Sequence, residues 1–150
     1  MNAPATVRRG FRVKLDLSSG VPVYRQIIDA VLGGIASGAL QAGDQLPTVR
    51  QLAVDLSINP NTVVRAYREL EIRGILSTQQ GTGTFITDQK VQTDDMEKQR
   101  RIAQLVRELL ARAGSEGITL QDILQHLEEL KEEQGVTGTN DGGARRTRRT

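Results

Sequence analysis

The hydrophobic residues in the first half of the chain recur at helical spacing in three successive segments. Spacings of three and four residues place apolar side chains on one face of an α-helix. The stripes are Tyr24, Ile27, Ile28, Val31, Leu32 and Ile35, then Val49, Leu52, Ala53 and Leu56, and finally Val63, Ala66, Tyr67 and Leu70. The pattern therefore predicts three helices, each with one buried face.

The second and third of these helices have clear start signals and lie close together in the sequence. The hydroxyl of Thr48 is suited to cap the second helix, with Gln51 reaching back to complete a capping box. Asn59 is suited to cap the third helix, and Pro60 occupies its first position, where the missing N–H has no cost. Because two residues alone separate the helices, the segment is predicted to be a helix-turn-helix.

Short runs on either side of these helices predict β-strands. From residue 11 to residue 18, apolar and polar residues alternate, which is typical of a half-buried strand. Residues 75–78 and 84–87 are two further strand-like runs, and the glycine-bearing loop 79–83 between them predicts a hairpin. Residues 11–87 are therefore predicted to form a winged helix-turn-helix DNA-binding domain, so that the fold is mainly α with a small β wing.

The second half of the chain carries two further amphipathic patterns. We predict a linker at residues 88–95 and a helix from about residue 96 to residue 113, ended by Gly114, with Thr119 and Asp122 capping a second helix. The apolar residues of these helices include Ile102, Val106, Leu109, Leu110, Leu120, Ile123, Leu124 and Leu127. Because two helices are too few to enclose a ligand pocket, residues 96–134 are predicted to form a helical dimerisation domain.

Charge is distributed unevenly along the chain, whose formal net charge is +2. Residues 1–87 contain nine basic and six acidic residues, residues 88–134 seven and eleven, and residues 135–150 four and one. This distribution is expected if the front binds a polyanion and the middle binds another protein. Residues 1–10 show no periodicity and are predicted to be a flexible arm, and the glycine- and arginine-rich residues 135–150 a disordered basic tail.

Four blocks between residues 21 and 87 resemble the GntR family of transcription regulators. The blocks read PVYRQI from Pro22, GDQLPTVRQLA from Gly43, NPNTVVRAYRELE from Asn59 and GTGTFI from Gly81, in the family's order and spacing. The resemblance implies a DNA-binding domain. The two-helix appendage and the start of the Asn59 block are similar to the YtrA subfamily, which implies a homodimeric repressor, often of a transporter operon.

Candidate DNA contacts follow from the chemistry of the residues and from the resemblance. A helix fits the major groove, where Asn pairs with adenine, Thr and Val contact a thymine methyl, and Arg binds guanine or phosphate. The predicted contacts are Arg50, Thr48, Asn59, Pro60, Asn61, Thr62, Val64, Arg65, Arg68, Gln80, Gly81, Thr82 and Gly83. In the family, residues matching Arg50, the start of the third helix and Gly81 contact DNA. Many relatives have arginine in place of Pro60 and Val64, so Arg50 and Arg65 are expected to carry more of the guanine readout.

Some of these residues also have a purely structural interpretation. Asn59 is expected to be a cap, and Gly81 and Gly83 also satisfy the backbone angles of a hairpin. The arginines of the tail are explained at least as well by solubilising disorder as by nucleic-acid binding. A winged helix that binds proteins without specific DNA binding is the alternative function, and an electrophoretic shift titrated with salt separates the two.

Other classes of function have little support in the sequence. Cysteine is absent, which excludes disulfides, thiolate metal sites and thiol nucleophiles. His126 has no neighbouring residues at metal-ligand spacing, and the motifs of nucleophilic catalysis and phosphate binding are absent. We expect no enzyme activity, no metal and no cofactor, and a cytoplasmic protein without a membrane segment. The sequence leaves open whether a small-molecule effector also binds.

Overall fold

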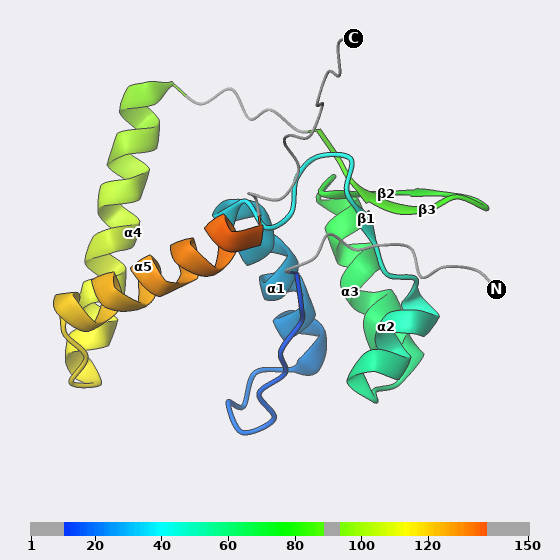
Figure 1. Cartoon of the computed structure of the whole chain (residues 1–150), viewed down its shortest axis with the longest axis horizontal. Coiled ribbons are helices and arrows are strands. Elements are labelled where there is room, and N and C mark those ends of the chain that lie inside the picture. The colour runs from blue at the N-terminus through cyan, green and yellow to red at the C-terminus, as the bar shows by residue number, and fades with distance from the viewer. Residues whose placement is uncertain (1–10, 89–93, 138–150) are drawn as a thin grey trace, which may run out of the picture. The chain divides into compact units, whose positions relative to one another are not determined.

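The computed structural model describes residues 11–88 and 94–137, and the chain divides into two compact units, Met1–Gln89 and Lys90–Thr150. The described elements, shown in Figure 1, are α1 (Val23–Ser37), β1 (Gln45–Leu46), α2 (Val49–Leu56), α3 (Pro60–Ile72), β2 (Leu76–Gln79), β3 (Gly83–Ile86), α4 (Asp95–Ser115) and α5 (Leu120–Thr137). The predicted fold class, mainly α with a small β wing, is confirmed. The predicted arm at 1–10 and most of the predicted tail lie outside the described residues, whereas α5 continues to Thr137.

The three helices of the first unit pack on one aliphatic core. Both α1 and α2 pack against α3, and the predicted apolar stripes supply the core. Its fully buried side chains include Ile27, Ile28, Val63, Ala66 and Leu70. Burying one large aliphatic side chain stabilises a fold by about 1.5–3 kcal/mol. This shared core therefore determines how α3 is oriented on α1 and α2.

Helices α2 and α3 begin where the start signals predicted. Thr48 Oγ1 accepts a hydrogen bond from the Gln51 backbone N–H at 3.1 Å, and Asn59 Oδ1 accepts one from the Asn61 N–H at 2.9 Å. The Gln51 side chain, however, does not reach back to complete the predicted capping box. Its Nε2 donates to Asp55 Oδ1 at 2.7 Å, because residues four apart lie on the same helix face and the carboxylate competes for the amide.

Three short antiparallel strands form a sheet in the order β1-β3-β2 (Figure 1). Strands β2 and β3 form the predicted wing hairpin, with Leu76 opposite Ile86. Strand β1 was not predicted, because two residues are too few to show an alternating pattern. It pairs with β3 through Gln45 opposite Phe85 and Leu46 opposite Thr84. This pairing places the segment that leads into α2 beside the wing.

The strand predicted from residue 11 to residue 18 does not form. Phe11, Val13 and Leu15 are half-buried and the residues between them are exposed, so the alternation indicated burial correctly as far as Leu15. Leu17, the next apolar residue of the predicted strand, is instead 80% exposed. The backbone of Asp16 is nevertheless bonded by a side chain: Gln26 Oε1 accepts from its N–H at 2.7 Å, and Gln26 Nε2 donates to its carbonyl at 2.8 Å. A strand also needs a neighbour with free backbone groups, and hydrophobic spacing does not reveal one.

In the second unit, a short connection at residues 116–119 joins α4 to α5, and the described side chains of both helices are almost all exposed. Helix α4 runs to Ser115 and so passes Gly114, where the sequence predicted its end; one glycine in a helix interior costs about 1 kcal/mol. The capping box of α5 is confirmed, since the Asp122 carboxylate accepts from the Thr119 N–H at 2.8 Å. Ala113 is the one described side chain of this unit that is buried.

Candidate nucleic-acid interface

The solvent-facing side of α3 is the first element of the candidate interface. Because Val63, Ala66, Tyr67 and Leu70 turn into the core, the opposite side of the helix remains exposed. It forms an open groove of about 410 Å³ lined by Asn61, Val64, Arg65, Arg68, Glu69 and Ile72. The structure therefore brings four predicted contacts, Asn61, Val64, Arg65 and Arg68, onto one side of one helix.

The start of α3 presents a second set of predicted contacts. Asn59, Pro60 and Asn61 are exposed, and Thr62 is half-buried. The side-chain oxygen Oδ1 of Asn59 is occupied by the cap, whereas the Asn61 side chain stays in solvent. In a helix that enters the major groove, the N-terminal residues reach the base edges, and the N-terminal end also favours phosphate.

Arg65 is held against α1 by stacking on an aromatic ring. Its guanidinium carbon lies 3.8 Å from the centre of the Tyr24 ring. At exposed positions such a contact is worth about 0.5–1 kcal/mol, and a stacked guanidinium keeps donors at its edge for other partners. The sequence predicted only that Tyr24 belongs to the core. Helical spacing does not show that the outer face of this half-buried ring contacts Arg65.

Arg50 adds a cation from α2. It is exposed in the first turn of that helix, two residues after the capping Thr48, which is also exposed. Within the described range 11–88, neither Arg50 nor Arg68 forms an ion pair. Both guanidinium groups are therefore free to bind phosphate, the contact that provides most of the salt-dependent affinity for DNA.

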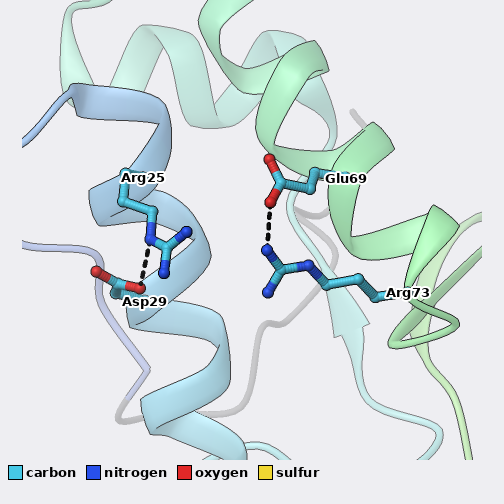
Figure 2. Close-up of polar contacts among 4 residues, drawn as sticks. All are labelled: Arg25, Asp29, Glu69 and Arg73. Carbon is cyan, nitrogen blue, oxygen red and sulfur yellow. Dashed lines mark hydrogen bonds and ion pairs between the residues drawn. The ribbon is translucent and has the colours of Figure 1, made fainter.

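Two other arginines of this unit are engaged within their own helices, as Figure 2 shows. Arg25 Nε lies 3.3 Å from Asp29 Oδ1 on α1, and Arg73 forms an ion pair with Glu69 on α3. These (i, i+4) pairs are partly exposed and contribute little to stability. Unlike Arg50 and Arg68, each of these two arginines therefore has a carboxylate partner within its own part of the chain.

The tip of the wing is a tight turn closed by a hydrogen bond from the Thr82 N–H to the Gln79 carbonyl at 3.1 Å. Gly81 has a φ of 76°, which residues with a Cβ rarely adopt. Gln80, Gly81 and Thr82 are exposed, as contacts to a DNA backbone require. Gly83 is instead half-buried against the side chain of Gln45, so its surroundings differ from those of the other predicted wing contacts.

Two hydrogen bonds join α3 and the wing to the segment that precedes α2. Tyr67 Oη donates to the Pro47 carbonyl at 2.8 Å, and burial raises the pKa of Tyr67 well above its ordinary value, so the hydroxyl stays a donor. Gln45 Nε2 donates to the Thr82 carbonyl at 3.1 Å. Sequence reasoning missed Gln45, because it lies in a two-residue strand and belongs to no periodic pattern.

The remaining chemistry of the described residues is sparse. Within residues 11–88 and 94–137, no group of His, Asp and Glu is placed to hold a metal ion. His126 is exposed, with its Nδ1 3.6 Å from Glu129 Oε2. None of the described helices is long and apolar enough to cross a membrane.

The chain is similar to known regulatory proteins over both of its units. Residues 23–86 match the family described as bacterial regulatory proteins, gntR family. The HTH-type transcriptional repressor YtrA of Bacillus subtilis is 35% identical over 118 residues, which cover 79% of this chain and 91% of that protein. The similarity therefore extends beyond the winged helix into the helical appendage.

Solved structures give the same result. A GntR family transcriptional regulator from Listeria monocytogenes is 33% identical, with a TM-score of 0.52 over 75% of this chain and 98% of its own. YtrA from Sulfolobus acidocaldarius, a GntR-family transcription factor, is 31% identical, with a TM-score of 0.50 over 66% of this chain and 97% of its own. This chain therefore belongs to the GntR family of DNA-binding transcription regulators and is a YtrA-like member of it.

Proposed function

We propose that the protein is a homodimeric transcription repressor that binds an inverted-repeat operator through α3, the start of α2 and the wing. The observation that carries the proposal is the exposed side of α3. There Asn61, Val64, Arg65 and Arg68 line one groove while the other side of the helix is buried. A helix whose polar side is open along its length can enter a major groove without rearrangement of the fold.

Each residue of that groove has a chemical role in the proposal. Asn61 is suited to pair with adenine, and Val64, a residue that is 41% exposed, is suited to contact a thymine methyl. Arg65 and Arg68 supply guanine or phosphate contacts. Thr62 lies at the edge of this surface, and Asn59 and Pro60 hold the start of the helix.

The start of α2 and the wing position the helix on the DNA in this proposal. Arg50 and Thr48 bind the sugar-phosphate backbone from one side. Gln80, Gly81 and Thr82 bind it from the other, where a glycine allows close approach. Phosphate contacts of this kind fix the register of the protein but carry little sequence information.

The second unit supports dimerisation because it lacks a core of its own. On α4, Ile102, Val106 and Leu109 recur at i, i+4 and i+7, and Leu109 is 48% exposed. On α5, Leu120, Leu124 and Leu127 repeat the same spacing, and Leu127 is 53% exposed. Such seams are buried when helices from two chains pack together. Leu110 and Ile123 are half-buried already and flank the two seams.

The symmetry of the proposed dimer determines the symmetry of the operator. A two-fold axis delivers two α3 helices to two half-sites in opposite orientation, so the preferred target is an inverted repeat. The Bacillus relative is named a repressor, and we extend that role to this protein, with a transporter operon as the target and the cytoplasm as the location.

The test uses the full-length protein and sites selected from random DNA. Fluorescence anisotropy at several salt concentrations would compare the selected inverted repeat with a single half-site. We expect tighter binding to the repeat and a steep loss of affinity as salt rises. Arg50→Ala should lower operator affinity roughly 5- to 150-fold, because one DNA contact contributes about 1–3 kcal/mol.

Arg25→Ala is the matched control, since it removes the same charge from α1 and costs one exposed ion pair. Its operator affinity should stay within about twofold of the wild type. Equal losses of operator affinity in both variants would show that Arg50 is not part of the interface. A stable monomer that binds the half-site as tightly as the repeat would contradict the dimeric form of the proposal.

A further inference from the structure

Gln45 links the wing to the rest of the first unit at a point that no hydrophobic periodicity marks. It belongs to β1, where it pairs with Phe85 of the central strand β3. Its side chain runs past this partner to the tip of the hairpin, where Nε2 donates to the Thr82 carbonyl at 3.1 Å. The hydrogen bond joins residues 37 positions apart in the sequence and ends on the turn that carries the exposed Gly81.

Gly83, which has no side chain, leaves the space that the Gln45 side chain occupies. A Cβ at Gly83 would collide with Nε2 of Gln45 and lie 3.2 Å from its Cδ. The Gly83 φ of 136° is also one that residues with a Cβ rarely adopt. The hydrogen bond to Thr82 and the room left by the missing side chain of Gly83 belong to one arrangement, in which the Gln45 amide lies under the wing tip.

The backbone that follows Gln45 leads directly to the other proposed DNA contacts. Pro47, two residues on, accepts the hydrogen bond from Tyr67 of α3, and Thr48 begins the helix that carries Arg50. Rotation of the wing about its hairpin would break the Gln45 bond while leaving the strand pairing of β2 and β3 intact. The pairing of β1 with β3 holds the wing at Phe85 and Thr84, and the Gln45 amide adds a tie at Thr82, nearer the tip.

We propose that Gln45 is a positioning residue for DNA binding, which holds the Gln80–Thr82 turn where it meets the backbone beside the half-site read by α3. This inference rests on the proposed function. Gln45 itself need not touch DNA: it acts through the Thr82 carbonyl. A residue with this role affects contacts at the wing more than those of α3, and that difference can be measured.

The first experiment compares Gln45→Met with Gln41→Met in the full-length protein. Methionine keeps the length and neutrality of glutamine but cannot donate a hydrogen bond. Gln41 is exposed in the loop before β1 and serves as the matched control. On the selected operator, Gln45→Met should bind roughly fivefold more weakly, while the slope of log affinity against log salt should stay the same, because the Gln80–Thr82 turn carries no charge and releases no counterion.

Hydroxyl-radical footprinting on the same operator separates positioning from general destabilisation. Gln45→Met should lose backbone protection at the outer flank, where the wing lies, and keep protection across the centre of each half-site. A variant that is merely less stable would weaken both regions together. If Gln45→Met and Gln41→Met have equal affinity and equal footprints, the inference is wrong although the proposed function stands. If the wild type selects no DNA, the proposed function fails first.

A double-mutant cycle tests the same contact without relying on one variant. Gly83→Ala should weaken operator binding, because the new methyl group displaces the Gln45 amide and strains the backbone. In a Gln45→Ala background there is no amide to displace, so the fold-loss caused by Gly83→Ala should be smaller than in the wild type. Equal fold-losses in the two backgrounds would overturn the inference.

Discussion

The guanidinium group of Arg65 lies over the ring of Tyr24, with 3.8 Å between the guanidinium carbon and the ring centre. The contact connects α3, which carries the proposed base-reading groove, to α1. A free arginine loses rotamer entropy when it binds DNA, and a stacked one has lost part of it already. Tyr24 therefore lowers the entropic cost of binding DNA through Arg65.

Replacement of Tyr24 should weaken DNA binding through Arg65. Tyr24→Leu keeps an apolar side chain on α1 but removes the ring face, and we expect a loss of about two- to fivefold in operator affinity, the equivalent of about 0.5–1 kcal/mol. Tyr24→Phe keeps the ring and should stay close to the wild type. Anisotropy titrations in an Arg65→Ala background provide the check, because Tyr24→Leu should have little further effect there.

Tyr67 should make the stability of the first unit depend on alkaline pH. Its pKa is raised from 10.0 by burial, so above pH 10 the folded state holds a proton that the unfolded state has released. The free energy of unfolding should therefore be unaffected by Tyr67 below pH 10 and fall above it, by up to about 1.4 kcal/mol per pH unit.

Urea unfolding of Tyr67→Phe at pH 8 and pH 11 tests this. At pH 8 the variant should lose about 1 kcal/mol, because the Pro47 carbonyl loses its hydrogen bond. At pH 11 the difference between the variant and the wild type should shrink or reverse. A constant difference at both pH values would show that the buried hydroxyl does not resist ionisation.

The two asparagines at the start of α3 should separate stability from recognition. Asn59→Ala removes the cap and should cost about 1 kcal/mol of unfolding free energy. Asn61→Ala leaves the cap intact, because the backbone N–H of residue 61 is the donor, and should change stability little. Its operator affinity should nevertheless fall roughly 5- to 150-fold if it pairs with a base. Equal unfolding curves for both variants would contradict the assignment of Asn59 as the cap.

The parts of this fold that could be predicted from sequence are those specified by local chemistry. The caps at Thr48 and Asn59 use backbone groups two or three residues away, and the core stripe of α3 depends on spacing alone. Exposure of Asn61, Arg65 and Arg68 follows from the same spacing, because residues off the stripe must face outward.

What could not be predicted depends on residues distant in the sequence. Strand β1 exists because β3 lies beside it, and Gln45 meets Thr82 across 37 positions. The helical patterns predict the positions of Arg65 on α3 and Tyr24 on α1 separately, and neither pattern shows that the two side chains are in contact. The run from Phe11 shows the opposite error, a strand that was predicted and does not form. Its alternation is a local pattern, but the described structure has no neighbouring strand paired with it, and the Gln26 side chain binds the backbone of Asp16 instead.

The last prediction concerns the exposed leucines of the second unit. Leu109→Glu places a charge in the seam of α4, and burying that charge at a dimer interface is costly when no opposite charge pairs with it. We expect the variant to sediment as a monomer and to lose the preference for the inverted repeat over a half-site, while binding to the half-site persists because the first unit has its own core. Gln104→Glu, an added charge at an exposed position of the same helix outside the seam, is the control and should remain dimeric. A dimeric Leu109→Glu would place the contact between copies elsewhere, because a glutamate inside the seam and a stable dimer are incompatible.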